Sequence, residues 1–165
     1  MGVLNSESLK LLNLTNGYNV AETIIKVITI ILLIVGSFSD IRTKRISILF
    51  PCVQFFVSVI YSLYGLSKGT MHYEELLLSF VPGILLLIIS FISRQGVGIG
   101  DGLMVLAIGP VLGMADMLLA TLIGFTLSSI VGGILLIMRR VNGKSTMAFI
   151  PFLTAGVGVM SFAFI

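Results

Sequence analysis

The sequence predicts an all-α, polytopic membrane protein built as a bundle of six transmembrane helices. Hydrophobic residues make up 57% of its 165 residues and charged residues only 10%, whereas soluble proteins carry roughly 25% charged residues. The apolar residues also occur in long runs, and a helix needs about 20 of them to cross a bilayer. Strands of a membrane barrel would instead alternate apolar and polar residues.

The apolar runs divide the chain into segments that alternate with short polar connectors. The connectors leave no room for a soluble domain, so we expect a polar or amphipathic N-terminal segment, residues 1–20, and one membrane domain, residues 21–165. The fourth run is short and contains Gly109 and Pro110. The six predicted spans are about 21–39, 46–66, 76–92, 102–115, 117–138 and 147–165.

Lysine and arginine residues are concentrated after the first, third and fifth runs. Basic residues in short loops stay on the cytoplasmic side, so we expect these loops in the cytoplasm and both termini outside the plasma membrane. The cluster of Arg139, Arg140 and Lys144 predicts contact with anionic membrane lipids. No basic tract with interleaved aromatic residues occurs, which argues against nucleic acid as a partner. The seven are Arg42, Lys44, Arg45, Arg94, Arg139, Arg140 and Lys144.

Cysteine and histidine are too scarce for a metal centre of the usual kind. The chain has one cysteine, Cys52, and one histidine, His72, whereas zinc sites need three or four such ligands. We therefore expect no metal and no cofactor.

Two aspartates border the apolar runs on the predicted cytoplasmic face. Asp40 ends the first run and Asp101 precedes the fourth, and the two complete runs between them return the chain to the same face. Two carboxyl groups held close together share one proton, so one can deprotonate a water while the other polarises a carbonyl. Asp40 and Asp101 are therefore the candidate catalytic residues.

Glycines surround the second aspartate. We assign Gly98, Gly100 and Gly102 to an active-site loop around Asp101. Because glycine lacks Cβ, we expect Gly96, Gly98 and Gly100 to adopt positive φ and let a substrate strand approach.

Three stretches carry a resemblance to a known family. "GIGD" at 98–101 resembles the signature of the GxGD membrane aspartyl proteases, and "SDIRTKRIS" resembles the stretch bearing the first aspartate of type IV prepilin peptidases. "MAFIPFLTAGV" resembles a late segment of the same family. The resemblance implies a membrane-embedded aspartyl endopeptidase that removes the leader peptide of type IV prepilin-like precursors at the cytoplasmic membrane edge, with Asp40 and Asp101 catalytic.

The chain departs from the family pattern at several positions. It has Ile46-Ser47-Ile48 where many relatives have Ile-Pro-Asn, and Asp101-Gly102-Leu103 where they have Asp-Val-Lys, which points to differences in the substrate or the loop. Larger relatives add a cytoplasmic domain with paired cysteines linked to N-methylation. With Cys52 alone, the chain resembles the short form without that domain.

Other functions and simpler roles fit parts of the pattern. The pair could cleave within a transmembrane helix, as in presenilin-like relatives, or relay protons in a small transporter or assembly subunit. Asp40 could instead pair with Arg42, Lys44 or Arg45, and Asp101 could be a helix N-cap. The depth of the two carboxyl groups and their proximity distinguish these alternatives.

Overall fold

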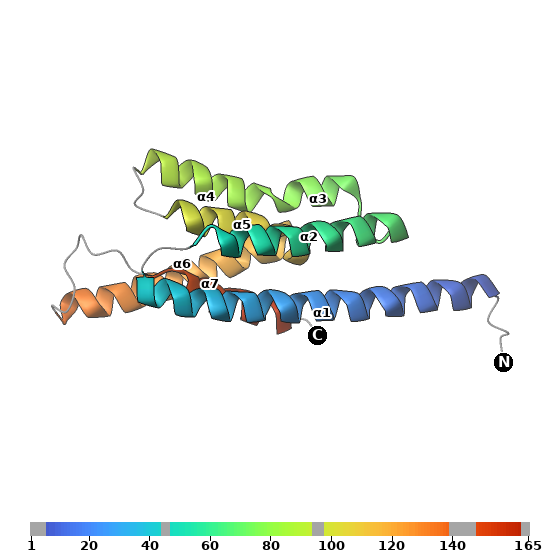
Figure 1. Ribbon diagram of the computed structural model, residues 1–165, viewed down its shortest axis with the longest axis horizontal. Helices are drawn as coiled ribbons and strands as arrows, with labels where there is room; N and C mark the ends of the chain where they lie inside the picture. The colour runs from blue at the N-terminus through green and yellow to red at the C-terminus, as the bar shows by residue number, and fades with distance from the viewer. Residues whose placement is uncertain (1–5, 44–46, 94–97, 139–147, 163–165) are drawn as a thin grey trace.

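The chain folds into helices throughout the part that the structure describes. The computed structural model describes residues 6–43, 47–93, 98–138 and 148–162, which contain helices and no strand. This confirms the predicted all-α class. In chain order (Figure 1) the helices are α1 (Ser6–Thr43), α2 (Leu49–Lys68), α3 (Tyr73–Ser79), α4 (Val81–Ile92), α5 (Ile99–Leu112), α6 (Met114–Ile137) and α7 (Ile150–Phe162).

The six predicted apolar runs each coincide with helical structure, but they differ in length. Among the described residues, four segments are long and apolar enough to cross a membrane: Val20–Arg42, Leu49–Lys68, Tyr73–Ile92 and Met114–Ile137. Helices α5 and α7 are shorter, with 14 and 13 residues. The positions of the runs are thus confirmed, whereas six complete crossings stay a prediction.

Large apolar side chains cover the outside of the bundle. Phe56, Phe91 and Ile137, on three different helices, are 70%, 85% and 82% exposed. Contiguous apolar surface of this kind is rare on soluble monomers, but it suits contact with lipid tails. Together with the four long apolar segments, it identifies a multi-pass membrane protein.

One helix boundary differs from the sequence-based expectation. Helix α1 runs from Ser6 to Thr43, and its membrane-length apolar segment begins at Val20, next to the expected end of the N-terminal segment. The third run is divided at Phe80 into α3 and α4, because Pro82 has no N–H to donate to the carbonyl four residues earlier.

Close helix contacts at glycines hold the bundle together around α5. A Cβ on Gly83 of α4 would collide with Leu106 Cα of α5, and one on Gly156 of α7 would collide with the Ala120 carbonyl oxygen of α6. Small residues let membrane helices approach in this way. Helix α5 contacts α1, α2, α3, α4 and α6, so most of its length, from Asp101 to Val111, is buried.

Candidate active site

The structure brings Asp40 and Asp101 to the same end of the bundle, as the alternation of runs predicts. Asp40 lies near the end of α1 and Asp101 in the first turn of α5, and these two helix ends lie at the same side of Figure 1. Both residues are buried, with 4% and 8% of their surface exposed. The two carboxyl groups lie within reach of each other's charge, so they form one candidate site.

Asp40 is held by the beginning of α7. Its Oδ2 accepts a hydrogen bond of 3.2 Å from the backbone N–H of Ile150, and the backbone N–H of Phe149 lies close to the same carboxyl group. The first N–H groups of a helix have no acceptor within the helix, and the positive end of the helix dipole favours an anion there. Asp40 therefore serves as the acceptor for the N-terminus of α7.

A second polar contact joins α1 to α7 one turn away from Asp40. Ser37 Oγ donates to the Leu33 carbonyl at 2.7 Å and lies 2.8 Å from Thr154 Oγ1. Ser37 and Asp40 are three positions apart and so lie on the same face of α1. Helix α7 thus fixes the rotation of α1 that points Asp40 into the bundle.

Asp101 is bonded to the residue that caps its own helix. Gly98 is the N-cap of α5 and Asp101 is the third helical residue, so the alternative that Asp101 itself is the N-cap is wrong. The Asp101 N–H donates to the Gly98 carbonyl at 3.1 Å, and the Asp101 carboxyl group lies beside the backbone N–H of Gly98, which is the position of the acidic residue in a capping box.

The glycines around Asp101 serve a purpose other than the expected one. Gly98 has φ −64° and Gly100 is helical, whereas the positive-φ glycines of the described residues are Gly69 and Gly113. The expectation of positive φ is therefore wrong for Gly98 and Gly100, and Gly96 lies outside the described residues.

What Gly98 supplies is space for a carboxyl group. A Cβ at this position would lie 2.8 Å from Asp101 Oδ2, so a larger residue would collide with the carboxyl group. Gly100 and Gly102 belong to α5 and not to a loop, which corrects that part of the assignment. Gly102 is needed for packing, because its Cβ would lie 2.8 Å from Leu87 Cδ2 of α4.

Of the basic residues expected to pair with Asp40, the structure describes only Arg42, and Arg42 makes another contact. The Arg42 guanidinium lies over the Phe38 ring, 5.2 Å from its centroid. Within the described ranges, the recorded salt bridge joins Lys26 to Glu22 and does not involve Asp40. Lys44 and Arg45, the other candidates, lie outside these ranges.

The backbone donors of Phe149 and Ile150 were not anticipated from the sequence. A signal for them exists, since proline is frequent at the first position of helices and Pro151 follows Ile150 directly. A helix starting there must present free N–H groups. Nothing in the local sequence, however, indicates that Asp40 would be their acceptor.

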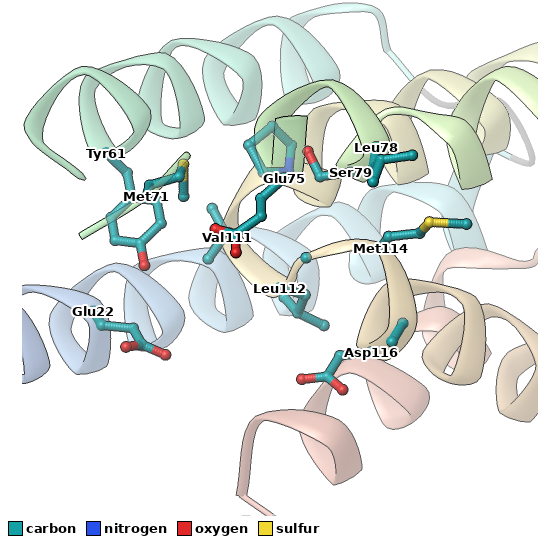
Figure 2. A pocket seen from close by; sticks show the side chains of 13 residues that line it. Glu22, Tyr61, Met71, Glu75, Leu78, Ser79, Val111, Leu112, Met114 and Asp116 are labelled. Atoms are coloured by element: carbon teal, nitrogen blue, oxygen red, sulfur yellow. The ribbon is translucent and has the colours of Figure 1, made fainter. Parts of the chain in front are cut away.

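A hollow lies at the opposite end of the bundle from the two aspartates. It has a volume of about 400 Å³, and the carboxylates of Glu22, Glu75 and Asp116 lie around it (Figure 2). Glu22 pairs with Lys26 at 2.7 Å, and Glu75 Oε2 accepts the His72 N–H at 3.3 Å. Across the described residues, no group of three acidic, histidine or cysteine side chains could hold a metal ion.

Comparison with known protein families gives a match that covers most of the chain. The type IV leader peptidase family matches residues 27–137, a range that includes both aspartates and six of the seven helices wholly or in part. Searches of curated proteins and of solved structures gave no match. Proteins of this family are proteases of the aspartic type. Since the match covers well over half of its length, the chain belongs to the type IV leader peptidase family.

Proposed function

We propose that the protein is an aspartic endopeptidase that removes the leader peptide from type IV prepilin-like precursors, with Asp40 and Asp101 as its catalytic pair. The observation that carries this proposal is that two buried carboxyl groups from different helices, α1 and α5, lie at one end of the bundle and within reach of each other's charge, in a member of a leader peptidase family. Each carboxyl group has a backbone N–H beside it, that of Ile150 for Asp40 and that of Gly98 for Asp101, so neither one needs the other acid for its own placement.

The chemistry follows from a proton shared between two carboxyl groups. The ionised member takes a proton from a water molecule, whose oxygen attacks the carbonyl carbon of the scissile peptide bond, while the protonated member donates to the carbonyl oxygen. The tetrahedral intermediate then loses its amine, which receives a proton as the C–N bond breaks. No metal is required to activate the water.

The distribution of buried charge favours a peptidase over a proton relay. A relay needs titratable groups along a path through the membrane. Among the described residues, the buried acidic side chains are Asp40 and Asp101, and both lie at one end of the bundle. We therefore place the cleavage at a membrane edge.

We also propose that the two shorter helices, α5 and α7, cross the membrane, which gives six spans in total.

Substitution of the two aspartates tests the proposed chemistry. Asp40→Asn and Asp101→Asn keep the size of the side chain but cannot exchange the proton, so each should lower the rate of precursor cleavage by about 10²-fold or more. The double variant should be little worse than either single variant, because the two groups act as a unit. The measurement is cleavage of a prepilin-like precursor by purified, folded protein.

Asp116→Asn at the opposite end of the bundle is the matched control and should cleave at the normal rate. Near-normal cleavage by both Asp40→Asn and Asp101→Asn would refute the proposal, and loss in only one would leave a mechanism with a single carboxylate.

Orientation of the site toward the cytoplasm is tested by labelling. In a Cys52→Ser background, cysteine is introduced at Lys68, at the far end of α2, or at Arg42, near Asp40. A membrane-impermeant maleimide added to intact cells should label Lys68→Cys, whereas Arg42→Cys should react only after permeabilisation, because basic loops stay inside. Labelling of Arg42→Cys from outside would reverse the proposed orientation.

A further inference from the structure

A buried polar cluster lies in the interior of the bundle, away from the two aspartates. Thr29 of α1 and Gln54 and Ser58 of α2 are each 0% exposed, and they lie in segments long enough to cross a membrane. Polar groups at this depth are costly unless they find partners. The cluster therefore requires an explanation that general packing does not give.

Its hydrogen bonds connect three helices. Gln54 Nε2 lies 3.0 Å from Thr29 Oγ1 and 3.4 Å from Ser58 Oγ, so both N–H groups of the amide have acceptors. Ser58 Oγ donates in turn to the Ala107 carbonyl of α5. A continuous series of hydrogen bonds thus runs from α1 through α2 to α5, with Gln54 in the middle.

Stability alone accounts poorly for this glutamine. Its Oε1 is buried and has no hydrogen-bond partner among the residues that the structure describes. An unpaired buried acceptor is destabilising, and an apolar side chain of the same shape would avoid that cost. What an amide adds, and an apolar residue does not, is a directional link that fixes two helices relative to each other.

The linked helices are those that carry the catalytic pair. Helix α2 packs against both α1 and α5 (Figure 1), whereas α1 and α5 share only a small direct contact. Asp40 follows Thr29 on α1, and Asp101 precedes Ala107 on α5. Polar contacts therefore hold α1 at two levels. Helix α7 contacts it near Asp40, and Gln54 contacts it deeper in the membrane.

We propose that Gln54 is a positioning residue for the aspartyl pair, setting the separation of the Asp40 and Asp101 carboxyl groups through its links to Thr29 and Ser58. This inference rests on the proposed peptidase function. Gln54 touches neither carboxyl group in this role and acts through the helices that carry them.

Two variants break the same link from opposite sides. Gln54→Met keeps an unbranched side chain of similar length but removes the amide, and Thr29→Val removes the acceptor while keeping the shape. Each should lower kcat by about tenfold or more with little change in KM, because small misplacements of reacting groups slow the chemical step. Each should also move the limbs of the pH–rate profile, since the separation of two coupled carboxyl groups sets their apparent pKa values.

Further variants separate positioning from general destabilisation. The Gln54→Met, Thr29→Val double variant should match either single variant, because both remove one interaction, and Thr29→Ser, which keeps the hydroxyl, should retain normal kcat. The control is Thr121→Val, whose Oγ1 donates to the Met117 carbonyl within α6 at 2.7 Å, and it should leave kcat and the pH profile unchanged.

The outcomes distinguish this inference from the function on which it rests. Gln54→Met or Thr29→Val protein that unfolds at a lower temperature but keeps the normal kcat and pH profile when folded would overturn the positioning role. If Gln54→Met does not fold, the milder Thr29→Val decides the question. Cleavage that survives both Asp40→Asn and Asp101→Asn would overturn the proposed function and this inference together, whereas loss of cleavage there with normal Gln54 and Thr29 variants would overturn this inference alone.

Discussion

The two ends of the bundle both carry carboxylates but keep them in different ways. At one end, Asp40 and Asp101 are buried and come from helices separated by two apolar runs, and Asp40 accepts the backbone N–H of Ile150. At the other end, Glu22 and Glu75 are partly or fully exposed and have partners within four residues along the chain, Lys26 and His72.

This difference shows which acidic groups long-range packing has brought together. A charge with a partner one helical turn away is satisfied by local structure and contributes little to the fold. Asp40 depends on Ile150, and Asp101 lies close to Asp40 only because the whole bundle is assembled. Burial and distant origin, and not the number of acidic residues, mark the candidate active site.

The largest effect expected from the comparison, apart from loss of the aspartates themselves, is at Gly98. Gly98→Ala would place a Cβ 2.8 Å from Asp101 Oδ2, so the carboxyl group must move, and a displacement of about 1 Å can cost roughly 10²-fold in rate. We expect cleavage to fall by about tenfold to 10²-fold while the protein remains folded. Steady-state kinetics on purified protein measures this.

Gly133→Ala provides the matched control, because nothing lies within 4 Å of its Cβ position in α6. It should leave the cleavage rate unchanged and increase stability slightly, since alanine is the better helix former. Equal activity of Gly98→Ala and the unmodified protein would mean that the placement of the Asp101 carboxyl group does not govern the reaction.

The smallest effect is expected at the opposite end. Glu22→Gln removes the 2.7 Å salt bridge with Lys26. The Glu22 side chain is 30% exposed and the Lys26 side chain 24% exposed. Pairs of this kind contribute about 0.3–0.5 kcal/mol, so the midpoint of thermal unfolding should fall by no more than a few degrees and cleavage should be unchanged. A drop in activity comparable to that of Gly98→Ala would contradict the division between the two ends.

The sequence predicted the helical class and the positions of the apolar runs because hydrophobicity and length are local properties. It also placed Asp40 and Asp101 on one face, since an even number of runs separates them. It did not predict that α3 and α4 are separate helices, although Pro82 is a visible signal, or that the glycines near Asp101 are needed for space and close packing. These features depend on which atoms lie opposite, such as Leu87 for Gly102.

The pairing of Asp40 with α7 shows the same limit. Pro151 marks the start of a helix, but only the packed structure assigns its free N–H groups to a carboxyl group 110 positions earlier. Similarly, the sequence shows Gln54 only as a polar residue within an apolar helix. Its hydrogen bond to Thr29 could not be predicted, because it depends on how α1 and α2 are aligned along their length.

The shortness of α5 bears on how water reaches a peptide bond at the membrane. Its 14 residues rise about 21 Å at 1.5 Å per residue, which is less than the hydrocarbon thickness of about 30 Å. A bundle with so short a member accommodates it by local thinning of the bilayer or by letting an aqueous vestibule extend inward. Under the proposed function, the length of this helix would set the depth of the scissile bond, so that a precursor is cut at the lipid boundary without first leaving it.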